Sequence, residues 1–218
     1  MFIGHWAPAL VAAASTRKAP PLVLLFIGAQ LIDWAFFALL LVGVEQMRVT
    51  PGISVMNPMD LYHMPYTHSL LGAAGFAGAV WLARSIIMRD TVGGLIGGAV
   101  VLSHWFLDLL VHVPDLTLAG SPPKLGLGLW NFPAVEMPLE LLITFGALWW
   151  YTKVRRPAPG RAMVLGALLL ALQAFNWFGP VATEVNAGTS LLAFVAYGLV
   201  TLAAWWTGKS ERKHARSL

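Results

Sequence analysis

Long apolar runs separated by short polar segments dominate the pattern of this chain. A hydrocarbon layer about 30 Å thick requires roughly 20 residues of α-helix at a rise of 1.5 Å per residue. Six runs reach or approach that length, at residues 22–44, 68–87, 91–112, 134–152, 162–182 and 189–207. The pattern therefore predicts an all-α fold, a polytopic transmembrane helical bundle with six long spans that forms one domain over residues 1–218.

A seventh apolar run, at residues 2–16, is shorter than the others. It would cross a bilayer only by thinning it, and otherwise enters part of the way. We therefore expect six or seven crossings, depending on this run. Its basic residues, Arg17 and Lys18, come after the apolar stretch, whereas a secretory signal places them first, so we do not expect a signal peptide.

The composition supports a membrane location. Hydrophobic residues make up 58% of the chain and charged residues only 11%, against about 25% charged residues in soluble domains. The absence of cysteine excludes disulfides, cysteine-ligated zinc fingers and iron–sulfur clusters. The net charge of +4 is concentrated in short loops and in the tail, so it bears on topology and does not indicate nucleic-acid binding.

Lysine and arginine alternate between the two sides of the predicted bundle. They are concentrated at 17–21, 84–91, 153–161 and in the C-terminal tail. The opposite loops, 45–67, 113–133 and 183–188, hold only Arg48 and Lys124. Cytoplasmic loops carry the excess of positive charge, so the first set and the C-terminus are predicted to be cytoplasmic. Loop 113–133, rich in Gly and Pro, is expected to form an ordered external cap.

Titratable residues lie inside these runs, where they are costly and by default mark a site. Asp33 and His104 lie about 16 and 20 Å from the cytoplasmic ends of their helices, counted at 1.5 Å per residue. Asp108 follows His104 by four positions and shares its helix face. His68 opens the second long run, and His5 lies in the short first run. All five are therefore expected in one layer of the outer half.

The stretch "DLYHMPYTHSLL" contains a second histidine, His63, five positions before His68. Pro65 lies between them and favours a turn followed by the start of a helix. We therefore expect His63 on the external loop and His68 in the first helical turn, with both side chains pointing inward.

Buried carboxylates need a cation or a proton, and the outer half offers almost no Lys or Arg for Asp33 or Asp108. Imidazole and carboxylate ligands suit zinc, and also iron or manganese. One or two divalent transition-metal ions, with zinc the first choice, would satisfy the pattern. Weaker candidates are left open between ligand, supporting and surface roles: Asp60, His112, Asp115, Glu136 and Glu140. Glu45 and Glu184 lie at external ends of spans and are expected to be solvated.

Two blocks resemble a known family. "HMPYTHSLL" and "SHWFLDLL" resemble the H-x4-H-S-L-L and S-H-x3-D blocks of the membrane-bound metal-dependent hydrolases, proteins of the bacterial inner membrane. Gly4-His5, Asp33 and the stretch "GLGLW" fit the same pattern, and the resemblance covers roughly residues 1–140. One position departs from the family, because Met64 stands where an Arg is often found.

The family is distantly similar to zinc-dependent phospholipase C, so the resemblance implies a phosphoesterase site with two or three metal ions. The metal ligands that it implies are His5, Asp33, His63, His68, His104 and Asp108.

These observations favour a metal-dependent hydrolase with its site at the external membrane face. Asp108 or Asp33 would act as general base if a single metal binds, and Trp130 and Asn131 would help to cap the pocket. The expected partners are membrane lipids and an amphiphilic ester or phosphoester substrate; oligomeric state is left open. Two alternatives remain: a metal- or proton-coupled transporter, and a haem or quinone electron carrier with His68 and His104 as axial ligands.

Overall fold

The computed structural model of the protein describes residues 1–180 and 183–214, with side chains through Glu211. The predicted run 162–182 therefore ends at residues outside the described part of the chain, as does the tail beyond residue 214. The described part is mainly helical. Its α-helices are α1 (Ala7–Ser15), α2 (Leu22–Ala29), α3 (Leu31–Leu41), α4 (Leu70–Ile87), α5 (Thr91–Val111), α6 (Pro133–Arg155), α7 (Pro159–Phe178) and α8 (Ala187–His214).

Short elements complete the chain. Two 3-10 helices are η1 (Ile3–Trp6) and η2 (Leu129–Asn131). Two antiparallel pairs of strands join β1 (Gln46–Val49) to β2 (Met59–His63) and β3 (Leu116–Thr117) to β4 (Lys124–Leu125). All four strands fall in the two long loops that the sequence places outside the membrane.

Four or five candidate spans replace the predicted six. Among the described residues, α4, α5, α7 and α8 are long and apolar enough to cross a membrane, and α2 with α3 forms a fifth candidate bent by 51°. The prediction of a span at 134–152 is wrong. Its helix, α6, has 23 residues, but Glu136, Pro138 and Glu140 make its first half too polar to qualify.

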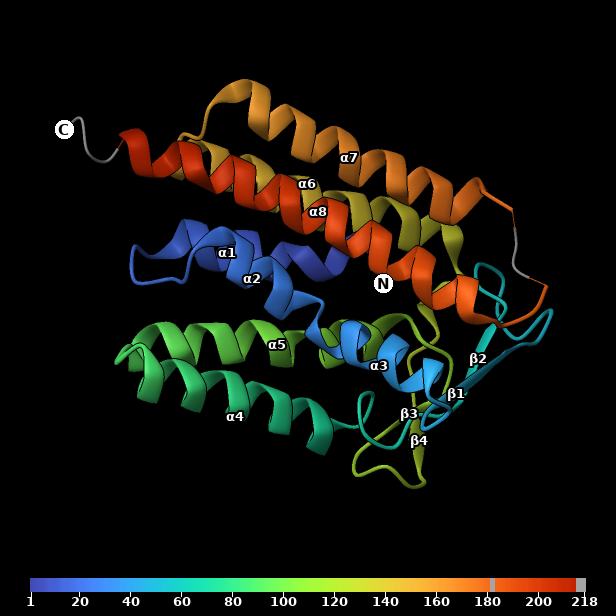
Figure 1. Ribbon diagram of the computed structural model, residues 1–218. Helices are drawn as coiled ribbons and strands as arrows, with labels where there is room; N and C mark the ends of the chain where they lie inside the picture. Colours follow the sequence, from blue (N-terminus) through green and yellow to red (C-terminus); the bar gives the residue numbers. More distant parts are fainter. Residues whose placement is uncertain (181–182, 215–218) are drawn as a thin grey trace.

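The N-terminal run is not among the candidate spans either. Its α-helix, α1, has nine residues, or about 14 Å of helix. Figure 1 shows the N-terminus near the middle of the molecule and α1 lying between the α4–α5 pair and helices α6 and α8. Trp6 and Leu10 are fully buried there, so this run is packed by protein on its sides.

Helices α4 and α5 pack closely because α5 carries glycines on the shared face. A Cβ atom at Gly94 would lie 2.7 Å from the carbonyl oxygen of Trp81, and one at Gly98 would lie 2.8 Å from that of Ala77. Small residues allow helix backbones to approach in this way. The Gly-rich stretch 93–99 is therefore a helix contact.

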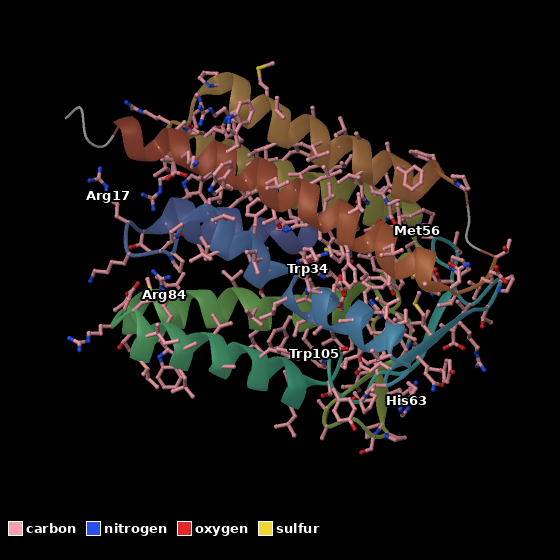
Figure 2. The ribbon with its side chains drawn as sticks, viewed as in Figure 1. Arg17, Trp34, Met56, His63, Arg84 and Trp105 are labelled. Atoms are coloured by element: carbon pink, nitrogen blue, oxygen red, sulfur yellow. The ribbon has the colours of Figure 1, made fainter. Side chains whose placement is uncertain are left out.

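The bundle has two unlike ends. Figure 2 shows Arg17 and Arg84 at one end, Met56 and His63 at the other, and Trp34 and Trp105 between them. We call the first the turn end, since it holds the α1–α2, α4–α5 and α6–α7 connections, and the second the strand end, since it holds β1–β4 (Figure 1).

Candidate metal centre

Five of the six predicted ligand residues meet inside the bundle. They form two groups whose ligand atoms lie within 4.8 Å of one another, and these groups share a histidine: His5, His104 and Asp108 in one, and Asp33, His68 and His104 in the other. The part of the chain that the structure describes therefore contains buried His/Asp groups that could hold a metal ion. The metal-ligand role of each residue stays a prediction.

His63, the sixth predicted ligand, lies apart from both groups. Its side chain is exposed on β2, where the strand pairs His63 with Gln46 of β1. His68 immediately precedes Ser69, the N-cap of α4, so it lies one position before the cap and not in the first turn as predicted. The hairpin thus turns His63 outward, and the helix cap holds His68 inward.

The broken span fixes the orientation of His104. At Gln30 the chain leaves the helical conformation, and the carbonyl of Ala29 accepts a hydrogen bond from His104 Nδ1 at 2.8 Å. A carbonyl can only accept, so Nδ1 carries a proton, and Nε2 of the neutral ring carries the lone pair. That Nε2 lies 3.1 Å from Asp108 Oδ2 and 3.4 Å from Asp33 Oδ1.

A hydrogen-bonded chain from Glu45 through Thr67 to His68 fixes the orientation of the His68 ring. The Thr67 hydroxyl donates to Glu45 Oε2, so its oxygen is left to accept from His68 Nδ1 at 2.9 Å. Glu45 also accepts the backbone N–H groups of Tyr66 and Thr67. His68 Nε2 then faces Asp33 Oδ1 at 3.4 Å and Asp108 Oδ2 at 3.5 Å. Glu45 is fully buried, so its predicted solvation is wrong.

His112, left open by the sequence, joins the same cluster. Its Nδ1 lies 2.9 Å from Asp115 Oδ1, and its Nε2 lies 3.3 Å from Asp108 Oδ1. Although burial alone lowers it, the two carboxylates Asp108 and Asp115 raise the pKa of His112 to about 9. The ring of Trp130 lies 4.2 Å from that of His112, beside the cluster, whereas Asn131 is exposed and bonds Gly128.

His5 is carried by η1 and is held from α6. Glu140 Oε1 accepts the backbone N–H groups of Phe2 at 2.6 Å and Gly4 at 2.9 Å, and its other oxygen accepts from Gln173 at 2.8 Å. Glu140 is therefore a positioning residue for the turn that bears His5. The His5 ring stacks on that of His104, with centroids 3.7 Å apart. Burial, with the neighbouring His104, lowers the pKa of His5 to about 3, so its ring is neutral.

Asp33 forms the edge of the cluster. Its Oδ2 accepts hydrogen bonds from Gln30 Nε2 at 3.2 Å and from the Tyr197 hydroxyl at 3.1 Å. The Asp33 side chain is 15% exposed, whereas that of Asp108 is 2% exposed. Asp33 is therefore the most exposed residue of the two groups.

Asp108 is the centre of the cluster. Its Oδ1 lies 3.0 Å from His5 Nε2 and 3.2 Å from the amino group of Met1. Its Oδ2 forms no hydrogen bond among the described residues, and neither do His104 Nε2 or the two ring nitrogens of His5. Within the same residues, no Lys or Arg forms an ion pair with Asp33 or Asp108. A divalent ion fits this set of buried, unpaired donor atoms.

Replacing Thr67 with valine is expected to weaken metal binding about 10- to 100-fold, the usual effect of removing a partner behind a ligand. Valine keeps the shape of threonine but ends the hydroxyl contact that orients His68. Competition with a chelator of known affinity measures the change. The matched variant Thr152→Val removes a hydroxyl that bonds only its own helix and should leave the affinity unchanged. Equal affinities in the two variants would contradict the role of the hydrogen-bonded chain.

Glu136 is a buried carboxylate that the cluster does not use. It is fully buried and neither oxygen has a hydrogen-bond partner among the described residues. Burial, followed by the nearby Glu140, raises its pKa from 4.5 to about 8. The folded protein then keeps a proton that the unfolded chain loses above about pH 4.5, so stability falls as the pH rises from that value towards 8.

The variant Glu136→Gln should lack this component and melt at a higher temperature than wild type at pH 8. Melting curves between pH 5 and 8.5 test the prediction, with the exposed Glu184→Gln as control. A Glu136→Gln protein whose melting temperature depends on pH as that of wild type does would show that Glu136 is ionised in the fold.

Asp60, also left open, forms a hydrogen-bonded ion pair with Arg48 at 2.7 Å. It belongs to the β1–β2 hairpin and to neither metal-binding group. Sequence reasoning missed the supporting residues of the cluster: Gln30, Glu45, Thr67 and Tyr197. Thr67 gave one usable signal, since it directly precedes His68 in the sequence.

Comparisons of the chain with known proteins found no match. No protein-family model matches the chain, and neither a curated protein nor a solved structure does. The resemblance to membrane-bound metal-dependent hydrolases therefore rests on the motif residues alone.

Proposed function

We propose that this protein is a membrane-embedded, metal-dependent hydrolase. One observation carries the metal site. In His68, His104 and His112, Nδ1 bonds an acceptor and Nε2 points at the carboxylates of Asp33 or Asp108. A histidine that ligates a metal commonly has its second nitrogen held in this manner. Where the ring is neutral, the lone pair of Nε2 faces a buried carboxylate, an arrangement that a proton or a metal ion between the two groups stabilises.

The two oxygens of Asp108 divide the histidines into two sets. His5 and His112 face Oδ1, and His68 and His104 face Oδ2, where Asp33 joins them. This division supports two ions with Asp108 between them, while a single ion would use the second set. Imidazole and carboxylate donors suit zinc first, with iron or manganese as alternatives.

The reaction follows from what such an ion does to water. A zinc ion held by these residues would polarise a carbonyl or phosphoryl oxygen and lower the pKa of a coordinated water to about 7. If a single ion binds without Asp33 as a ligand, Asp33, at the exposed edge of the cluster, would act as general base and accept a proton of the attacking water. Tyr197 and Gln30 both donate to its Oδ2, which leaves Oδ1 directed at the cluster.

The substrate class follows from the location. The lysine and arginine bias supports a cytoplasmic turn end and an external strand end, as in a bacterial inner membrane. Trp130, beside the cluster, belongs to the loop at the strand end. A lipid or another amphiphile with an ester or phosphoester bond is the natural substrate for a site between that surface and the helices.

A second candidate, a transporter of metal ions or protons, is favoured by one feature. The span α2–α3 is broken beside Asp33, and discontinuous helices line ion sites in many transporters. A haem carrier is disfavoured, because Asp33 and Asp108 lie within 3.5 Å of Nε2 of His68 and His104 and occupy the space between the rings.

Purified, metal-loaded protein in phosphatidylcholine nanodiscs tests the proposal against a panel of fluorogenic carboxylic esters, phosphodiesters and phospholipids. We expect metal-dependent release of product that is lost in His104→Ala and kept in the exposed-histidine control His63→Ala. The hydrolase is refuted if the loaded protein cleaves nothing in the panel. If proteoliposomes then take up zinc and His104→Ala prevents it, the transporter is the function.

A further inference from the structure

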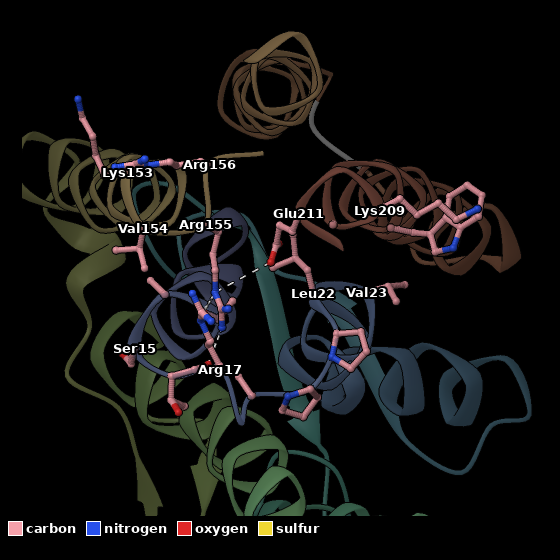
Figure 3. A pocket seen from close by; sticks show the side chains of 18 residues that line it. Ser15, Arg17, Leu22, Val23, Lys153, Val154, Arg155, Arg156, Lys209 and Glu211 are labelled. Carbon is pink, nitrogen blue, oxygen red and sulfur yellow. Dashed lines mark hydrogen bonds and ion pairs between the residues drawn. The ribbon is translucent and has the colours of Figure 1, made fainter. Parts of the chain in front are cut away.

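At the turn end, the helices line an open pocket of about 870 Å³ that includes no residue of the His/Asp cluster. It lies among the end of α1, the start of α2 and the last turns of α6 and α8 (Figure 3). The proposed hydrolase reaction does not involve the residues of this pocket. The pocket is distinguished by its positive charge. Its lining contains five basic residues and one acidic residue, Glu211: Arg17, Lys153, Arg155, Arg156 and Lys209.

Arg155 builds the wall of the pocket. Its guanidinium donates at 2.5 Å to the carbonyls of Ala13 and Thr16, which closes the end of α1. Figure 3 shows its side chain and that of Glu211 pointing towards each other, and the two groups are 4.0 Å apart. The Arg155 charge is thus partly offset and fixed in place.

The other four basic side chains are exposed. Lys209 Nζ lies 3.5 Å from the centroid of the Trp205 ring, and Lys153 Nζ lies 5.9 Å from that of Trp149. No ion pair within the described residues offsets the charge of Arg17 or Arg156.

The pocket also has an apolar wall. Leu22, Val23, Val154 and Trp205 line it alongside the basic groups. A soluble inorganic anion would make no favourable contact with that apolar surface. A lipid has apolar chains next to its anionic headgroup and could contact both parts of the pocket. Basic pockets between membrane helices on the cytoplasmic side bind anionic headgroups for this reason.

We propose that this pocket binds a phosphate group, and that the phosphate belongs to an anionic phospholipid of the surrounding leaflet. The site is separate from the metal cluster and does not depend on the hydrolase proposal. It would hold α1, α2, α6 and α8 together at the end of the bundle that carries the positive charge.

The test uses the full-length protein in a neutral detergent and measures its melting temperature with three probes: dihexanoyl phosphatidic acid, dihexanoyl phosphatidylcholine and inorganic phosphate. We expect phosphatidic acid to stabilise the protein and the other two to do so far less. In the double variant Arg17→Gln/Lys209→Gln, the affinity for phosphatidic acid should fall at least about tenfold, since each lost basic group near an anionic lipid costs about 1 kcal/mol.

The matched control is Lys18→Gln/Arg89→Gln, which removes two charges from the same end without altering the lining of the pocket. Equal losses in the two double variants, or no stabilisation of wild type by phosphatidic acid, would overturn the site. Stabilisation by inorganic phosphate as strong as that by phosphatidic acid would overturn the lipid as the source and leave a soluble phosphate.

Discussion

Replacing Asp108 with alanine is expected to lower metal affinity by more than about 100-fold, beyond the range seen for partners behind a ligand. His5, His68, His104 and His112 all bring Nε2 within 3.5 Å of this one carboxylate, so its loss removes a ligand from both sets. Equilibrium dialysis against zinc, followed by elemental analysis, measures the change.

Asp60→Ala is the matched control, because Asp60 is a mostly buried aspartate whose partner is Arg48. It should bind metal as wild type does. The isosteric Asp108→Asn, checked for native size and helix content, separates loss of the ligand from loss of the fold. An Asp108 variant that binds zinc with wild-type affinity would rule out this residue as the centre of the site.

Metal should also stabilise the fold strongly. Without an ion, the buried carboxylates of Asp33 and Asp108 face Nε2 of His68 and His104 and need protons on these rings to offset their charge. A ligand that binds only the folded state adds about 2.7 kcal/mol when present at 100 times its dissociation constant. We therefore expect zinc to raise the melting temperature of protein stripped by a chelator, and His104→Ala to abolish the rise. The idea fails if wild type melts at the same temperature with and without zinc, or if His104→Ala retains the full rise.

Local spacing predicted the parts of the centre that lie on single helices. His104 and Asp108 are neighbours because four residues make about one turn, and counting residues along each run put Asp33 and His5 at the same depth. These inferences need only helix geometry and the distribution of Lys and Arg. The four runs that became α4, α5, α7 and α8 followed from apolar length in the same way.

Contacts between distant segments could not be derived in this manner. His63 is turned outward because β2 pairs with β1, and strand pairing depends on residues far apart in sequence. Glu45 is buried because Thr67 and its neighbours fold over it. The break at Gln30 contains no proline, so hydropathy counts 22–44 as one continuous run although the chain bends by 51° there.

The polarity of α6 is visible in the sequence, where Glu136 and Glu140 fall within the apolar run 134–152. Both Glu136 and Glu140 are buried, and Glu140 accepts hydrogen bonds from the N-terminal turn and from α7. Through Glu140, α6 holds η1 and with it His5. The same carboxylates make the first half of α6 less apolar than a membrane span requires.

Elemental analysis of tag-free protein tests the central claim most directly, since an affinity tag of histidines would itself carry metal. The account predicts one or two transition-metal ions per chain in wild type, near none in His104→Ala and the wild-type amount in His63→Ala. Wild-type protein without stoichiometric metal after dialysis against zinc, or His104→Ala with as much metal as wild type, would contradict it.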